Sequence, residues 1–218
     1  MKEFDDAIQQ LGKILLFINA TLYTYSYLKG KKSKEIKYFT IYLTLIFCVL
    51  IGSNLLIQVQ RKYNFELNNL YLSHFYFIFQ FIFLSLFYRQ LFNKNQKKYL
   101  NVISVLVFLV LIIQYTVKAN LFSKFNLLEI LITSFPLVLY SIFHLYNSLS
   151  KPGKFMYINA GVLIYIATST LIFILGDYLS VIDREIASDA WFLNRVFYVG
   201  YLILILIEWK KSLWKMKN

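Results

Sequence analysis

Few residues in this chain of 218 could do chemistry. The chain has two histidines, His74 and His144, and one cysteine, Cys48, while 59% of its residues are hydrophobic and 19% are aromatic. His74 lies in the segment LYLSHFYFIFQFIFLSLFY, residues 70–88, among apolar and aromatic neighbours. A histidine in such a segment could be a metal ligand, a proton acceptor, part of a sensor, or a polar group satisfied between helices.

The two histidines are too far apart to share a metal ion or a haem. At 1.5 Å per helical residue, His74 lies about 8 Å below one surface and His144 about 25 Å below the same surface. Cys48 alone can form neither an internal disulfide nor a thiolate zinc site. The sequence has no HExxH, GxSxG or glycine-rich phosphate loop, and its last apolar run has no lysine for a retinal Schiff base. We therefore expect no metal, no cofactor and no enzymatic activity.

Polar residues inside apolar runs are costly to bury in a membrane and point to functional sites. A set of them falls near those ends of the runs that we expect to lie on the outer side: Asn54, Gln58, His74, Gln114, Glu129, Asp177 and Arg195. One interpretation is an outward-facing polar pocket that binds a small ligand. The other is structural: these side chains cap helices, pair Asp177 with Arg195, or bond between helices at about 0.6 kcal/mol per bond.

His74 tests the two interpretations. If the outer residues form one cluster, His74 lies near Gln114, Glu129, Asp177 or Arg195. Its two ring nitrogens both need partners at that depth. A carboxylate would favour the charged imidazole and apolar walls would oppose it, so we expect a histidine that responds near neutral pH. The alternative is a histidine that only holds helices together.

The elements that position these residues are seven apolar runs, each about as long as a helix needs to cross the hydrocarbon core. To within a few residues, the runs are 8–28, 38–60, 69–91, 100–117, 127–148, 157–178 and 191–209. They do not alternate in polarity as the strands of a membrane barrel would. We therefore expect an all-α transmembrane bundle of seven helices that forms a single domain over residues 1–218.

The basic residues give the orientation, because basic loops stay in the cytoplasm. Of the 23 lysines and arginines, fifteen fall on one side and eight on the side of the amino terminus. We expect the amino terminus outside and the carboxy terminus in the cytoplasm of a bacterial inner membrane. The acidic start MKEFDDAIQQ is unlike the basic start of a cleaved signal peptide.

The net charge of +12 is therefore expected mostly on the cytoplasmic face. Anionic lipids are the expected partners there, at about 1 kcal/mol for each basic residue. A cytoplasmic protein partner is the alternative, and assembly into a homo-oligomer stays open. The lysines carry no nucleic-acid-binding signature.

The segments LYLSHFYFIFQFIFLSLFY and YINAGVLIYIATSTLIFIL resemble a loose group of small bacterial seven-helix membrane proteins without assigned chemistry. The sixth run also resembles the lysoplasmalogenase-like membrane family, which implies hydrolase activity. That family carries acidic residues within its spans, where this chain has Thr168, Ser169 and Thr170. In size and architecture the chain further resembles membrane accessories encoded beside RNA-targeting CRISPR effectors, which implies a regulatory role in antiviral defence.

We expect a sensor or regulatory accessory with an outward-facing polar pocket and a basic cytoplasmic face. The first alternative is a small-solute transporter or channel, and the second is a lysoplasmalogenase-like hydrolase. Carriers often use interrupted helices, and Pro136 lies within a run, while Gly161 and Gly200 lie where helices could approach closely. The nearly apolar inner half of the runs argues against a wide hydrated path.

Overall fold

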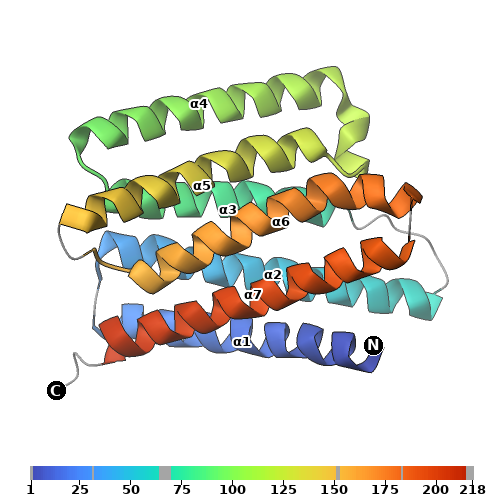
Figure 1. Cartoon of the computed structure of the whole chain (residues 1–218), viewed down its shortest axis with the longest axis horizontal. Coiled ribbons are helices and arrows are strands. Elements are labelled where there is room, and N and C mark those ends of the chain that lie inside the picture. Colours follow the sequence, from blue (N-terminus) through green and yellow to red (C-terminus); the bar gives the residue numbers. More distant parts are fainter. Residues whose placement is uncertain (1, 31, 64–69, 151–152, 183, 215–218) are drawn as a thin grey trace.

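Helices joined by short connections make up the residues that this computed structural model describes, which are 2–30, 32–63, 70–150, 153–182 and 184–214. Figure 1 shows the α-helices running along the long axis of the molecule. The elements are α1 Lys2–Lys29, α2 Lys34–Tyr63, α3 Tyr71–Leu91, α4 Lys94–Val117, the short 3₁₀ helix η1 Ala119–Ser123, α5 Leu127–Ser150, α6 Met156–Ile182 and α7 Arg184–Ser212. The predicted all-α bundle of seven helices is confirmed.

Most helices extend beyond the apolar runs that predicted them. The run 191–209 belongs to α7, which begins at Arg184 and ends at Ser212. Backbone N–H and C=O groups need partners whatever their side chains are, so a helix continues into polar sequence until other groups replace its bonds. At the start of α4, the Asn93 side chain accepts from the Gln96 N–H and the Gln96 side chain accepts from the Asn93 N–H.

Six helices form a closed ring in which each contacts the next: α1, α2, α3, α5, α6 and α7, with α7 returning to α1. The fourth helix in sequence, α4, lies outside this ring against α3 and α5, at the top of Figure 1. The ring closes because α3 and α5 contact each other directly. On α4 the buried residues are Leu100, Val107 and Leu111, and most of the others are exposed.

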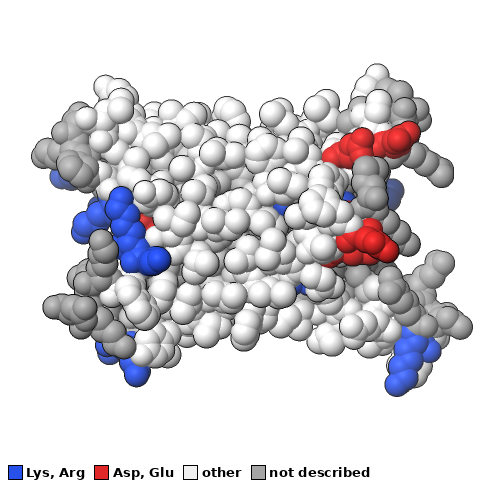
Figure 2. Space-filling view, turned by 60° about the horizontal axis from the view of Figure 1, so that its bottom comes forward, with Lys and Arg blue, Asp and Glu red and all other residues white. Residues whose placement is uncertain are grey.

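The protein is a multi-pass membrane protein by the character of its helices. In the described part of the chain, α2 to α7 are each long and apolar enough to cross a membrane. Figure 2 shows the charged side chains of this face gathered mainly at the two ends of the molecule, with few of them between. The remaining helix, α1, has 28 residues and lies beside α2 and α7, so its crossing stays a prediction. Cys48 on α2 is exposed.

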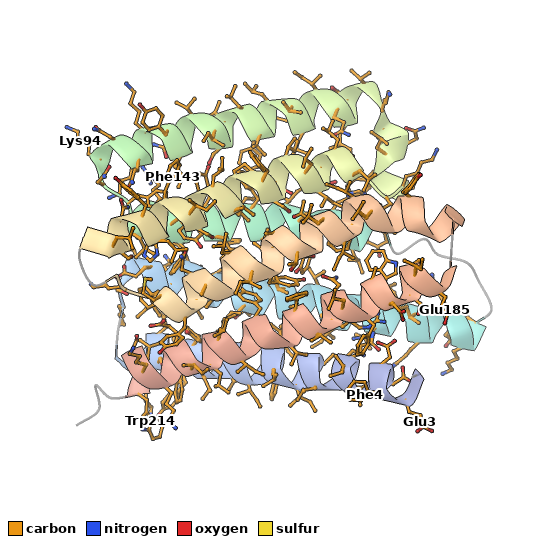
Figure 3. The ribbon with its side chains drawn as sticks, viewed as in Figure 1. Glu3, Phe4, Lys94, Phe143, Glu185 and Trp214 are labelled. Carbon is orange, nitrogen blue, oxygen red and sulfur yellow. The ribbon has the colours of Figure 1, made fainter. Side chains whose placement is uncertain are left out.

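The two ends of the bundle differ in the helix termini that they hold. The outer end, as we name it from the predicted orientation, holds the starts of α1, α3, α5 and α7. Figure 3 shows Glu3 and Glu185 at this end and Lys94 and Trp214 at the opposite, inner end. Which end faces the cytoplasm stays a prediction.

Close packing of α6 against α7 depends on Gly161. A Cβ atom at this position would lie 2.7 Å from Cδ2 of Tyr201 on α7, closer than real side chains approach. Gly200 was expected at a similar helix contact, but a Cβ atom there would have nothing within 4 Å. The expectation for Gly200 is therefore wrong, because its side of α7 faces open space.

Candidate functional site

A buried polar cluster joins α3, α4 and α5 near the outer end. The Nδ1–H of His74 on α3 donates to Oε2 of Glu129 on α5 at 2.5 Å. The hydroxyl of Tyr115 on α4 donates to the same carboxylate oxygen and lies 3.0 Å from Nδ1. His74 is 2% exposed and Glu129 is fully buried. The predicted proximity of His74 and Glu129 is confirmed, and we call these three residues the His74 cluster.

Asn126 connects the His74 cluster to the start of α5. Its side-chain oxygen accepts the Glu129 N–H at 3.2 Å and a hydrogen of the Gln114 amide at 2.9 Å. Its amide nitrogen donates to the Tyr115 hydroxyl at 3.3 Å. Asparagine is a preferred residue before the first turn of a helix, and acidic residues are favoured within that turn. The pattern N-x-x-E before an apolar run could have identified Asn126 from the sequence.

The helix η1 covers the imidazole from the outer end. The Phe122 ring of η1 stacks on His74 with 5.3 Å between ring centroids and 23° between planes. Within the described part of the chain, Nε2 of His74, Oε1 of Glu129 and Oε1 of Gln114 are buried without a hydrogen-bond partner. Such groups cost about 1–3 kcal/mol each, so the cluster is strongly bonded on one side and unsatisfied on the other.

This arrangement can hold or exchange a proton but does not form a nucleophilic triad. A carboxylate bonded to one ring nitrogen fixes the orientation of the imidazole and leaves the other nitrogen for proton transfer. In a triad that other nitrogen would bond a serine or cysteine. No hydroxyl or thiol of the described residues bonds Nε2 of His74.

The other residues predicted for the outer cluster lie elsewhere. Arg195 on α7 forms a two-point ion pair with Asp5 on α1, with 2.5 Å from Nε to Oδ1 and 2.7 Å from a terminal nitrogen to Oδ2. The side chain of Asp177 lies outside the described residues, and so does its expected pairing with Arg195. Asn54 is half-buried and Gln58 is exposed, both on α2. Neither has a hydrogen bond to the His74 cluster in the described part of the chain.

Arg195 lines a separate cavity of about 380 Å³ in the outer half of the ring. We call it the outer cavity. It lies between α2, α3, α6 and α7, with Phe125 from the loop before α5. Its lining residues are Ile46, Val49, Leu50, Ser53, Leu70, Leu72, Ser73, Tyr76, Phe77, Phe125, Tyr165, Phe173, Asn194, Arg195 and Tyr198. Of the residues predicted to form the polar pocket, Arg195 lines this largely apolar cavity, and His74, Gln114 and Glu129 do not.

A layer of tyrosines lies at the inner side of the outer cavity. The Tyr76 and Tyr165 hydroxyl oxygens are 3.2 Å apart, and Tyr201 donates to the Tyr42 hydroxyl at 3.3 Å. Tyr165 stacks on Tyr201 with 5.3 Å between ring centroids, and its ring centroid is also 5.3 Å from that of Tyr198. We call these five residues the tyrosine layer. Sequence reasoning missed it because tyrosine is common in apolar segments and gives no pattern.

Other polar residues within the helices, including those named next, bond locally or at the inner end. Thr168 and Thr170, in the region compared with the hydrolase family, donate to carbonyls of their own helix. Glu208 accepts the Tyr157 N–H at the start of α6. His144 lies fifteen residues after Glu129 on α5, a rise of about 22 Å. The two histidines are therefore in different regions, as predicted.

No protein-family model, curated protein or solved structure matches the chain.

Proposed function

We propose that the protein is a sensor in a bacterial inner membrane and that its outer cavity binds a small, largely apolar molecule. The observation that carries this proposal is a cavity confined to the outer half of the helix ring, with the tyrosine layer beneath it. Ligand sites of proteins are commonly about 300–1,000 Å³, mostly apolar, with a few polar groups. The outer cavity has this size and this lining.

Packed side chains separate the outer cavity from a second cavity of about 500 Å³ at the inner end, lined by Ile36, Met156 and Glu208 among others. The two cavities share no lining residue, which favours a sensor over a transporter. Phe39 on α2 has its ring centroid 5.2 Å from that of Tyr23 on α1 and 5.3 Å from that of Phe87 on α3. Leu202 and Ile205 on α7 are fully buried at the same level. The buried polar side chains Asn19, Ser141 and Asn159 in this region donate to backbone carbonyls, whereas a carrier needs polar groups that are open to its substrate. We therefore expect ligand binding without passage of the ligand.

The signal would travel along α7, because this helix lines the outer cavity and also reaches the inner end. Tyr198 lies in the cavity wall, and Lys210 follows twelve residues later, about 18 Å along the helix axis. Lys210 and Lys211 belong to the basic inner end, where a cytoplasmic protein could dock. The resemblance to accessories of RNA-targeting CRISPR effectors makes such an effector the first partner to test.

Cavity filling tests the ligand site. N-phenyl-1-naphthylamine is an apolar probe whose fluorescence rises in apolar sites, and it would be titrated into nanodiscs that hold the purified protein. Leu50→Trp fills the outer cavity, whereas Leu55→Trp makes the same change on a 55% exposed position of α2. We expect saturable binding in the wild type and in Leu55→Trp and its loss in Leu50→Trp.

Equal binding by all three proteins would contradict the ligand site. Uptake of a small solute by vesicles that contain this protein alone would contradict the sensor and favour the transporter. Reporter fusions after Lys34, Lys97 and Lys154 test the orientation, because all three should report the cytoplasm. An adjacent effector gene would favour the accessory role, and a metabolic operon would favour transport.

A further inference from the structure

Arg195 is the one charged residue that lines the outer cavity in the described part of the chain. Asp5 engages one edge of its guanidinium, through Nε and one terminal nitrogen. A guanidinium carries five N–H groups in a fixed plane, so Asp5 uses two of them. The other three have no hydrogen-bond partner among the described residues. Two of these three form the end edge of the planar guanidinium, which can bind a carboxylate or phosphate at two points.

The outer cavity changes in polarity from its outer end to its inner end. Its polar residues outside the tyrosine layer are Ser53, Ser73, Asn194 and Arg195. On α2 and α7 these are the lining residues nearest the outer end, although Leu70, Leu72 and Phe125 add apolar lining at that end. Deeper along α2 and α3 the lining is Leu50, Val49, Ile46 and Phe77. From Ser53 to Ile46 the helix rises about 10 Å. A ligand that fits this gradient has a polar head at the outer end and a short apolar chain toward the tyrosine layer.

Given the proposed function, on which this step depends, we infer that the outer cavity takes an amphipathic monoanion. Its carboxylate or phosphate binds the free edge of Arg195, and its medium-length alkyl chain lies along α2 and α3 toward the tyrosine layer. Asp5 keeps Arg195 in position because it holds the opposite edge. The nearby acids Glu3 and Asp6 are exposed to solvent, where salt and water screen their repulsion of an anion.

Three probes with the same ten-carbon chain test the charge of the ligand: decanoate, decan-1-ol and decyltrimethylammonium. Each would displace N-phenyl-1-naphthylamine from the protein in nanodiscs of neutral lipid. We expect decanoate to compete best. A hydrogen-bonded charge contributes about 1.5–3 kcal/mol, so Arg195→Gln should weaken decanoate by about tenfold or more and decan-1-ol by less than about twofold.

Asp5→Asn is the matched variant, because it keeps the side-chain shape and removes the negative charge beside Arg195. It should strengthen the binding of decanoate relative to that of decan-1-ol. If Arg195→Gln does not fold, this variant tests whether the ligand is an anion. Equal affinities for decanoate and decan-1-ol in wild type and Asp5→Asn would overturn the anionic class while the ligand site stands. Equal binding of N-phenyl-1-naphthylamine by Leu50→Trp and Leu55→Trp would instead overturn the proposed function itself.

The anion could come from solution or from the bilayer. The same titration in nanodiscs that contain phosphatidylglycerol separates these sources. Weaker apparent binding of decanoate there would identify an anionic membrane lipid as the natural occupant. Unchanged binding would identify a free amphipathic acid.

Discussion

Replacing Glu129 by leucine tests whether the His74 cluster holds the outer end of α4 in place. Glu129 is fully buried, and its Oε2 accepts hydrogen bonds from His74 and Tyr115. Leucine has a similar length but no acceptor. After the change, the Tyr115 hydroxyl can still reach Nδ1 of His74, because the two atoms are already 3.0 Å apart. One contact of the cluster is therefore kept.

Two estimates of the cost differ, and the structure decides between them. Bonds between membrane helices average about 0.6 kcal/mol, so two of them give about 1.2 kcal/mol. Removing one partner of a buried ion pair costs about 3–5 kcal/mol. Leucine also removes Oε1 of Glu129, a buried acceptor without a partner among the described residues. Its removal raises the free energy of unfolding by about 1–3 kcal/mol. The burial of His74 and Glu129 favours the second estimate, reduced by this gain, so we expect a loss of about 2 kcal/mol.

The assay is reversible unfolding in bicelles, measured as the free energy of unfolding. A double-mutant cycle with His74→Phe separates the pair from other effects. Because His74→Phe removes the imidazole whose carboxylate partner is lost in Glu129→Leu, the double variant should be more stable than the sum of the single losses by about 1 kcal/mol or more. Single losses within about 0.5 kcal/mol of wild type, or additive losses, would refute a buried pair. The same cycle between about pH 5 and 8 tests whether His74 responds near neutral pH, and an unchanged coupling energy would contradict that response.

Two further predictions concern packing and capping. Gly161→Ala should destabilise the protein by about 1–3 kcal/mol, because its methyl group would contact Tyr201. Gly200→Ala should have a free energy of unfolding within about 0.5 kcal/mol of wild type. Equal effects of the two changes on the free energy of unfolding would contradict the packing of α6 on α7. Asn126→Ala should cost about 1 kcal/mol for the lost helix cap, with additional loss from Tyr115; no change in unfolding would show that the cap contributes nothing.

The number of helices, and the end of the bundle near which His74 and Glu129 lie, could be predicted from the sequence, because run length reflects the thickness of the membrane. That is why His74 and Glu129 were placed at a similar depth on two helices. Which helices touch could not be predicted, since depth says nothing about position around the bundle. The start of a helix was a second feature that could not be predicted: Asp5 precedes the apolar run 8–28, but α1 begins at Lys2. The helix therefore carries Asp5 alongside α7, where it meets Arg195.

The position of α4 outside the ring bears on the two interpretations that the sequence left open. Polar contacts hold α4 near both ends: Tyr115 bonds Glu129 at the outer end, and Gln96 and Asn147 exchange amide hydrogen bonds of 3.0 and 2.9 Å at the inner end. Between these contacts, an entirely apolar groove of about 460 Å³ lies between α4 and α5.

Apolar packing therefore contributes less to holding α4 than it does within the ring, and polar bonds at its ends are needed to fix its position. For His74, Gln114 and Glu129, the structural interpretation accounts for the observed contacts without any ligand. The ligand interpretation rests instead on Arg195, which faces a cavity across α3 from the His74 cluster. Because α3 contributes Tyr76 to that cavity and His74 to the cluster, the helix that holds α4 in place also forms a wall of the proposed ligand site.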